Sequence, residues 1–127
     1  MTVSPMGYHH VDMDEVEPTP DRPCVRRSIS ESADVENVAV NLYEPEPGEE
    51  IPLAYHYHDE QEEVFYVVSG ELTVETPEET YRVGENEAFV VEPESPQFAA
   101  VDEDADEGAH VLVLGAPAVD DVHPYER

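Results

Sequence analysis

The sequence predicts a single all-β domain, folded as an antiparallel sandwich or barrel. Apolar residues fall in short runs of strand length, 12 prolines and 6 glycines separate these runs, and helical periodicity is hard to find. A length of 127 residues suits one domain and is enough to bury a core without disulfides. We therefore expect about eight to ten short strands.

Two runs support this prediction best. Val38, Val40 and Leu42 alternate within residues 35–43, which indicates a strand with one buried face. Residues 63–68 (EVFYVV) are apolar on both faces, which indicates a central strand. In chain order, the expected strands span residues 24–30, 35–43, 53–58, 63–68, 71–76, 80–83, 87–92, 97–101 and 109–114.

The two ends of the chain carry no clear strand pattern. Residues 1–20 are polar and contain proline, so we expect an extended N-terminal arm there. We expect residues 21–117 to form the domain and residues 118–127 to form a C-terminal tail.

The charge balance is extreme, because 32 acidic residues oppose 5 basic ones and the net charge is −27. Such a chain repels itself in dilute buffer, and molar salt shortens the screening length to about 3 Å. The composition favours a salt-loving, haloarchaeal-like protein over a partly disordered one, because 39% of the residues are hydrophobic and gather in strand-length runs. Five scattered arginines cannot form a basic patch for nucleic acid or for an anionic membrane.

The remaining bulk features place few further constraints on function. Cys24 is the only cysteine, which excludes an intramolecular disulfide and favours a structural thiol. The sequence shows neither a secretory signal nor an apolar run long enough to span a membrane, so we expect a cytoplasmic protein.

The segment around His56 and His58 carries the candidate chemistry. Two histidines that are two residues apart on a strand project from the same face, so their imidazoles can share one metal ion. Glu62 and Glu63 follow a short polar turn, and a returning strand would bring one of them beside the histidines. Two imidazoles and one carboxylate with open positions suit Fe, Mn, Ni or Zn as a divalent ion. Surface histidines without a metal are the alternative.

Residues 48–70 resemble the first motif of the cupin superfamily, in particular that of small single-domain cupins. His56-x-His58 is followed by four residues, by Glu63, and after six more residues by Gly70. The distance from Gly70 selects Glu63 over Glu62 as the motif glutamate, and the spacer from Gly48 to His56 is longer than is usual in the family. The resemblance covers residues 35–115 and implies an antiparallel double-stranded β-helix, a jelly-roll-like barrel.

Residues 86–98 are similar to the second cupin motif. Glu87 stands at the acidic position, and Pro93 and Pro96 match the proline-rich turn, but Gln97 replaces the family's histidine. The resemblance therefore implies a divalent metal held by His56, His58, Glu63 and Gln97. An amide oxygen is a weaker ligand than imidazole for transition metals. The alternative is a lost metal site in which Gln97 only forms hydrogen bonds.

The surroundings of the expected site follow from strand parity. Phe65 and Val67 share parity with Glu63, so we expect them to line the pocket together with Phe98 and His110. No catalytic acid or base can be named. The resemblance implies an oxygenase or isomerase acting on a small organic molecule, and a homodimer. The alternatives are a non-catalytic ligand-binding module and a structural protein with a vestigial pocket.

Overall fold

The computed structural model describes residues 7–52 and 54–126. Residues 1–6 of the expected arm, Leu53 at the start of the expected strand 53–58, and Arg127 at the end of the expected tail lie outside the described residues. The strands are β1 (Val25–Ser28), β2 (Ala39–Glu44), β3 (His56–His58), β4 (Glu62–Ser69), β5 (Leu72–Glu75), β6 (Thr80–Val83), β7 (Ala88–Val91), β8 (Phe98–Ala100), β9 (His110–Ala116) and β10 (Val122–Pro124). The helical elements of the described residues are a 3₁₀ turn, η1 (Met13–Glu15), and a single α-helical turn, α1 (Ile29–Ser32).

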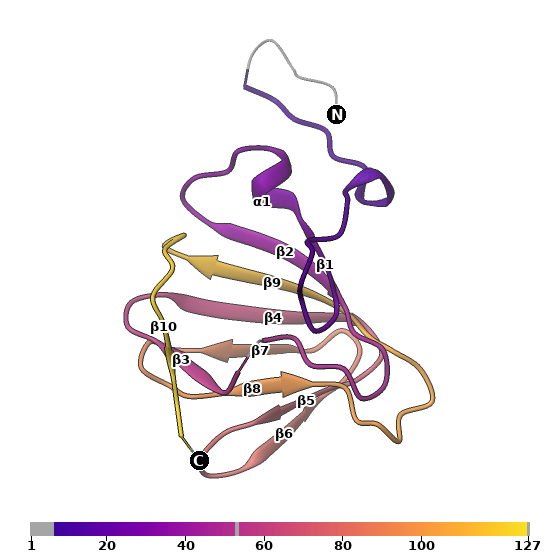
Figure 1. Cartoon of the computed structure of the whole chain (residues 1–127), viewed down its shortest axis with the longest axis vertical. Coiled ribbons are helices and arrows are strands. Elements are labelled where there is room, and N and C mark those ends of the chain that lie inside the picture. Colours follow the sequence, from indigo (N-terminus) through magenta and orange to yellow (C-terminus); the bar gives the residue numbers. More distant parts are fainter. Residues whose placement is uncertain (1–6, 53, 127) are drawn as a thin grey trace.

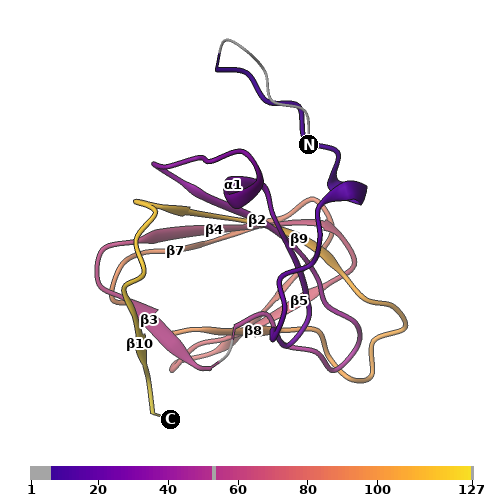
Figure 2. The same cartoon turned by 45° about the horizontal axis from the view of Figure 1, so that its top comes forward.

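The predicted all-β fold is confirmed, because antiparallel strands form two layers that face each other (Figures 1 and 2). One layer is a five-stranded sheet in the order β1-β2-β9-β4-β7. Strand β4 lies inside this sheet, between β9 and β7, as its apolar faces predicted. The other layer contains the sheet β6-β5-β8 and the pair β10-β3.

Backbone pairing joins the two parts of the second layer. The amide of Gln97 donates to the His56 carbonyl (2.9 Å), and the amide of His56 donates to the Gln97 carbonyl (3.3 Å). Earlier in the same stretch, the amide of Ile51 donates to the Ala99 carbonyl (3.0 Å). Residues 50, 51 and 56 therefore lie beside β8 and the residue before it, and this pairing holds β3 across from β4.

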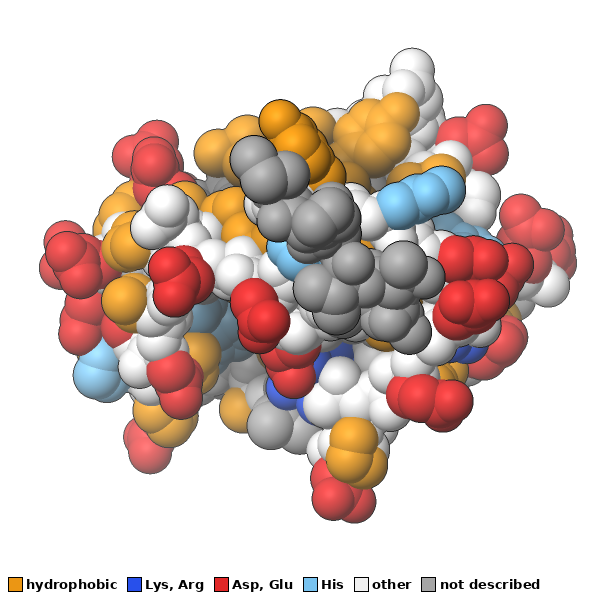
Figure 3. Space-filling model, turned by 90° about the horizontal axis from the view of Figure 1, so that it is seen from above, with side chains coloured by type: hydrophobic (Ala, Val, Ile, Leu, Met, Phe, Trp, Pro, Cys, Tyr) orange, Lys and Arg blue, Asp and Glu red, His pale blue; other side chains and the backbone are white. Residues whose placement is uncertain are grey.

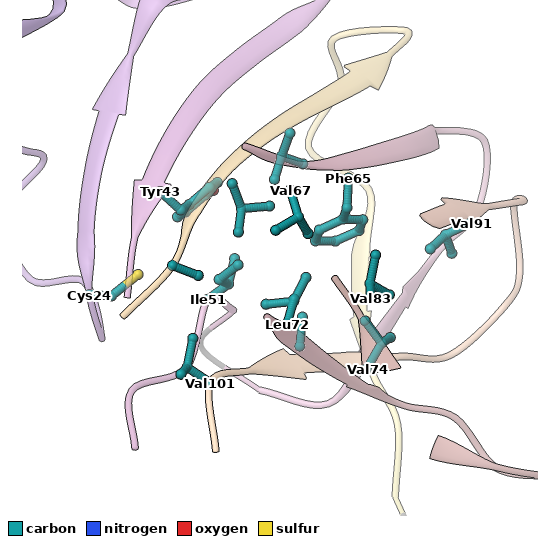
Figure 4. Close-up of a cluster of buried hydrophobic side chains, with 14 residues drawn as sticks. Cys24, Tyr43, Ile51, Phe65, Val67, Leu72, Val74, Val83, Val91 and Val101 are labelled. Atoms are coloured by element: carbon teal, nitrogen blue, oxygen red, sulfur yellow. The ribbon is translucent and has the colours of Figure 1, made fainter. Parts of the chain in front are cut away.

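A cluster of buried apolar side chains lies between the layers (Figure 4). Val67 and Val111 from the five-stranded sheet and Leu72 and Val74 from β5 have no exposed surface. Cys24 lies at the edge of this cluster, where burial raises the pKa of its thiol to about 11. The thiol is therefore protonated at neutral pH, which agrees with a structural role.

The turn after β4 requires glycine. Gly70 has a positive φ of 83°, and a Cβ atom there would lie 2.6 Å from the Gly108 carbonyl oxygen. Because only glycine fits both constraints, this residue fixes the connection between the two layers.

Two regions differ from the expected strand pattern. The expected strand at residues 24–30 ends at Ser28, whose hydroxyl accepts a hydrogen bond from the Glu31 amide (3.1 Å) and so caps α1. The expected tail contains β10, which pairs with β3 so that Val122 is opposite His58 and Pro124 is opposite His56. This strand occupies the outer edge of β3, which would otherwise leave its backbone groups unpaired.

The described part of the expected arm packs on its own chain. Arg27 Nη1 donates to the Val16 carbonyl (2.6 Å), and Arg26 Nη1 donates to the Thr19 hydroxyl (2.7 Å). The Thr19 amide also donates to the Arg26 carbonyl (2.8 Å). Residues 16–19 are thus fixed against β1.

The surface is dominated by carboxylates, as the view in Figure 3 illustrates. Arg82 shows how a basic residue is used there, because its Nη1 lies 3.0 Å from both Glu71 and Asp102. Among the described residues, no helix is long and apolar enough to cross a membrane.

We expect the free energy of unfolding to rise with salt. Between 0.1 M and 1 M salt the screening length falls from about 10 Å to about 3 Å, which weakens repulsion among the surface carboxylates. Urea titrations in 0.1, 0.5, 1 and 2 M KCl should show a rising midpoint at each step. A midpoint that is constant or falls with KCl would contradict a composition adapted to salt.

Candidate metal centre

Three ligand-type side chains meet between the layers. His56 and His58 point the same way from β3, their rings lie 5.0 Å apart, and each residue is only 7% exposed. Glu63 reaches them from β4, the next strand along the chain. One ligand atom from each of the three residues lies within 4.8 Å of the other two. These residues could therefore hold a metal ion.

The structure distinguishes the two candidate glutamates. Glu63 is inside the cluster, and its Oε1 lies 3.2 Å from His58 Nε2. Glu62 is exposed. The turn at residues 59–61 sets the phase of β4, so that Glu63 shares the inner face with Phe65.

Gln97 completes the cluster from the other side. It is 2% exposed, and its backbone bridge to His56 places its side chain beside the histidines. Its Nε2 donates to Glu63 Oε1 (3.2 Å) and lies 3.4 Å from His56 Nε2. The amide group thus contacts two of the three ligand-type residues.

Hydrogen bonds set the tautomers of both histidines. His56 Nδ1 lies 2.8 Å from the Ala54 carbonyl, which only accepts, so Nδ1 carries the proton. His58 Nδ1 lies 2.9 Å from Asp121 Oδ1 and donates to that carboxylate. In the neutral rings, both Nε2 atoms therefore present their lone pairs to the cluster. Carboxylate and carbonyl partners commonly orient metal-binding histidines in this way.

Asp121 is the residue of this cluster that the sequence did not reveal. It lies within the expected C-terminal tail at residues 118–127, and it reaches His58 because β10 pairs with β3. Its Oδ2 accepts from the amides of Glu60 (2.7 Å) and Gln61 (3.1 Å) while its Oδ1 holds His58. The alternation of Val122 and Pro124 with Asp121 and His123 was the available signal.

Gln61 holds the same part of the chain. Its Nε2 donates to the carbonyls of Pro117 (3.0 Å) and Val119 (3.4 Å). Its side chain lies over Gly115, where a Cβ atom would be 2.7 Å from Gln61 Cδ. Residues 117–125, which we call the C-terminal segment, are therefore fixed over β3 by side-chain contacts as well as by β10.

The histidines have opposite pKa shifts. Burial lowers the pKa of His56 and outweighs the hydrogen bond to the Ala54 carbonyl and the charge of Glu63. Burial also acts to lower the pKa of His58, but the contacts with Glu63 and Asp121 outweigh it and raise that pKa. Burial opposes ionisation of Asp121, yet the donors at Glu60, His58 and Gln61 lower its pKa to about 2.

The cluster forms part of the wall of a cavity of about 440 Å³. Phe65 lines the cavity as strand parity predicted, and so do the four expected ligands. Among the described residues, the other wall residues are Arg22, Arg26, Ala39, Asn41, Tyr43, Ile51, Pro52, Ala54, Gln61, Val113, Gly115, Ala118, Val119, Asp120, Val122 and Pro124.

Three expected pocket residues lie elsewhere. Val67 faces inward but is fully buried in the core cluster, one pleat beyond Phe65. Phe98 stacks on Tyr55, with ring centroids 6.3 Å apart. His110 is on the outer face of β9, where its side chain is 53% exposed and its Nδ1 contacts the Ser69 hydroxyl (3.1 Å). For His110, the opposite parity to Val111 and Val113 directs the side chain away from the cavity.

Unpartnered buried atoms support the fit of a cation. Gln97 Oε1 is buried and forms no hydrogen bond, and neither does His58 Nε2 while its ring is neutral, because the Glu63 carboxylate 3.2 Å away also only accepts. Both atoms can accept, and a buried acceptor without a partner is unfavourable. A metal ion bound between His56, His58 and Glu63 would satisfy His58 Nε2, and rotation of the Gln97 amide by half a turn would present its oxygen to the same point.

Comparisons with known proteins agree with this architecture. A family model described as the cupin domain matches residues 41–114, more than half of the chain. No protein with a curated description matches the sequence.

Several solved structures share the fold. The polyketide cyclase RemF from Streptomyces resistomycificus superposes with a TM-score of 0.77 at 19% identity, covering 94% of this chain and 87% of that one. A conserved protein with a double-stranded β-helix domain from Klebsiella pneumoniae gives 0.74 at 18% identity, covering 94% and 99%. A sugar phosphate isomerase of the cupin superfamily from Silicibacter pomeroyi gives 0.70 at 22% identity, covering 85% and 75%.

Replacing Asp121 should weaken metal binding and shift its pH dependence. In the metal-free protein a proton competes for His58, whose pKa is raised, so metal affinity should increase as the pH rises through that pKa and then level off. Asp121→Asn should lower the plateau affinity by about 10–100-fold. It should also move the levelling point to lower pH, because the charge that raises the pKa of His58 is gone.

Metal titrations between pH 5.5 and 8.5 would measure both effects. Asp59→Asn is the matched control, because Asp59 contacts His123 (2.6 Å) on the exposed outer side of the same β3–β10 pair. An Asp121→Asn variant with the affinity profile of the unsubstituted protein would show that Asp121 does not act through His58.

Proposed function

Because this chain belongs to the cupin family, we propose that it holds a divalent transition metal and acts on a small organic molecule, as an oxygenase or isomerase. One observation carries the proposal. His56, His58 and Glu63 converge to within 4.8 Å on the wall of a cavity large enough for a small molecule. Iron, manganese, nickel and zinc all suit such a nitrogen and oxygen ligand set.

Each residue has a distinct task in this proposal. The Ala54 carbonyl and Asp121 keep the Nε2 lone pairs of His56 and His58 directed at the metal position. Glu63 supplies the negative charge, and Gln97 turns its amide to become a fourth, neutral ligand. When bound, the metal would supply Lewis-acid polarisation of a substrate oxygen or an activated water or dioxygen at its open positions.

The cavity wall would orient the substrate. Phe65 and Val113 offer apolar contacts beside the metal position, and the C-terminal segment contributes Ala118, Val119 and Val122. The side chains of His58 and Glu63 are themselves only 8% and 14% exposed, which strengthens electrostatic contacts between them. The printed names of two structural neighbours, a polyketide cyclase and a sugar phosphate isomerase, fit a small-molecule substrate.

A non-catalytic ligand-binding role is the second candidate, and Gln97 favours it. In its present orientation the Gln97 amide donates to Glu63 and lies beside His56 Nε2, so it contacts two ligand atoms without a metal. A binding module would keep this arrangement. An enzyme would exchange it for a metal with open positions.

We also propose a homodimer formed through the outer face of the five-stranded sheet. Strand pairing aligns Val40, Leu114, Val64 and Val90 in one row across four strands of that face. Val90 is 61% exposed. A continuous apolar row on a sheet face is typical of a surface that packs against another sheet.

The protein would work in the cytoplasm at high salt.

Metal content tests the proposed function first. Protein purified untagged in molar KCl without chelators should contain close to one equivalent of iron, manganese, nickel or zinc. His56→Ala should abolish the saturable, tight binding, because it removes one of the two imidazoles. His9→Ala is the control, because His9 is exposed and outside the cluster.

Comparing these two variants distinguishes metal binding at the cluster from weak cation binding at the acidic surface, which does not require His56. Equal metal content in both variants, or no saturable binding of any of the four ions, would contradict the metal centre. A metal-free protein that still binds small molecules would support the second candidate.

Light scattering in 1 M KCl tests the dimer. The unsubstituted protein should give twice the chain mass of 14.2 kDa. Val90→Glu should give a monomer, because it places a charge in the apolar row. Val35→Glu, at an exposed valine outside the sheet, should stay dimeric. A monomeric unsubstituted protein would contradict the proposed dimer.

A further inference from the structure

We propose that the part of the cavity beside β1 and β2 binds the carboxylate of the small molecule whose other end faces His56, His58 and Glu63. Arg22 and Asn41 form this subsite. The inference rests on the proposed function in assuming that a small molecule occupies the cavity, and it adds the chemical class of that molecule.

The inference rests on the position of buried polar atoms that have no hydrogen-bond partner. In the described part of the chain, the buried side-chain nitrogen and oxygen atoms without a hydrogen-bond partner are Arg22 Nε, Asn41 Oδ1, His58 Nε2 and Gln97 Oε1. All four residues line the same cavity. Unpartnered buried polar atoms are rare in folded proteins, and their concentration around one cavity indicates a ligand that satisfies them.

The four atoms divide into two groups. His58 Nε2 and Gln97 Oε1 belong to the metal centre. Arg22 Nε and Asn41 Oδ1 lie outside it, and neither is explained by a metal. Arg22 Nε is a donor and matches a carboxylate, which only accepts. Asn41 Oδ1 is itself an acceptor, so the Asn41 amide joins this subsite by rotating half a turn, which presents its Nδ2 donor to the same carboxylate.

The charge of Arg22 is unusual in this chain. Arg26, Arg27 and Arg82 each lie within 3.0 Å of a carboxylate oxygen. Arg22 has no ion pair with any residue between 7 and 126 that the structure describes, although the sequence has 32 acidic residues. Its described contacts are a hydrogen bond from Nη2 to the Ile51 carbonyl (3.3 Å) and the Tyr43 ring, 6.0 Å from the guanidinium carbon.

The contacts with Ile51 and Tyr43 hold Arg22 in place but leave its charge uncompensated. An uncompensated guanidinium on a cavity wall attracts an anion, and the planar donors of arginine match a carboxylate. Because Arg26 on the same wall is already paired with Glu31 (3.0 Å), only one positive charge is free. One free charge suits a singly charged carboxylate better than a doubly charged phosphate.

Sheet register gives the separation of the two ends of the cavity. Asn41 on β2 is in one row with Val113 on β9 and Phe65 on β4. Two strand spacings separate Asn41 from Phe65, which is roughly 10 Å. Glu63 follows on the same face of β4. A chain of about six carbon atoms spans such a distance, so one molecule can reach both ends.

The experiment uses a metal-binding probe with and without a remote carboxylate. Adipic acid monohydroxamate carries a metal-chelating group at one end and a carboxylate at the other. Its neutral analogue has a primary amide in place of the carboxylate. Affinities of both probes for the zinc-loaded protein are measured by calorimetry, at the lowest KCl concentration that keeps the protein folded.

The carboxylate probe should bind at least tenfold more tightly than the amide probe. Arg22→Gln should reduce this preference to less than twofold without changing zinc content, and Arg22→Lys, which keeps the charge, should retain part of it. Arg82→Gln is the control for total charge, because Arg82 is exposed and paired with Glu71 and Asp102. That variant should keep the full preference.

Equal affinities of the two probes in the unsubstituted protein would overturn the inference, and so would a preference that persists in Arg22→Gln. A tenfold preference for a phosphonate-ended probe over the carboxylate probe would overturn the carboxylate class.

The metal-free protein separates this inference from the proposed function. If zinc is not retained, hexanoate and hexanamide are compared instead. A preference for hexanoate that depends on Arg22 would support the subsite while the metal centre fails. Retained zinc with equal probe affinities would support the metal centre while the subsite fails.

Discussion

The hydrogen bond from His58 Nδ1 to Asp121 joins two segments that are 63 residues apart in the chain. Through this contact the C-terminal segment fixes the tautomer and orientation of one of the two histidines. The same carboxylate accepts from the amides of Glu60 and Gln61, which fixes the turn that sets the phase of β4 and thus the position of Glu63. The geometry of the centre therefore depends on a part of the chain that contributes no ligand.

The C-terminal segment also lines the cavity. Ala118, Val119, Val122 and Pro124 form part of its wall, so the residues that orient His58 also shape the space beside it. Gln61 links the two roles, because its side chain binds the carbonyls of Pro117 and Val119 above Gly115. The orientation of His58 and the shape of the cavity beside it thus depend on one segment.

The cavity wall of this protein differs from its surface in the balance of charged residues. The surface carries most of the 32 acidic residues, whereas the cavity wall contains two of the five arginines together with the carboxylates of Glu63 and Asp120. Among the residues that the structure describes, no carboxylate forms an ion pair with Arg22, and the unpartnered buried polar atoms lie on the same wall. This arrangement favours an anionic ligand even though the whole chain repels anions, since contacts inside a partly enclosed cavity are screened less than those at the surface.

Local patterns in the sequence predicted most of the fold. These patterns involve only neighbouring residues: the alternation in β2, the two apolar faces of β4, the turns between strands, and the two-residue spacing of His56 and His58. Long-range contacts were not accessible in this way. Asp121 and β10 acquire their roles only from pairing with β3, and Arg22 acquires its role from the arrangement of β1, β2 and the Ile51 loop. His110 was placed in the pocket from its strand alone, and the parity of β9 directs it outward.

The proposed metal centre requires that the histidines of β3, and not the acidic surface, hold the ion. X-ray absorption spectroscopy on protein loaded with one equivalent of zinc or nickel distinguishes these two kinds of site. We expect a first coordination shell with two imidazole nitrogens at about 2.0–2.1 Å together with oxygen ligands, and loss of the imidazole scattering in His58→Ala. A shell of oxygen atoms alone, unchanged by that substitution, would rule out the histidine centre and assign the metal to surface carboxylates.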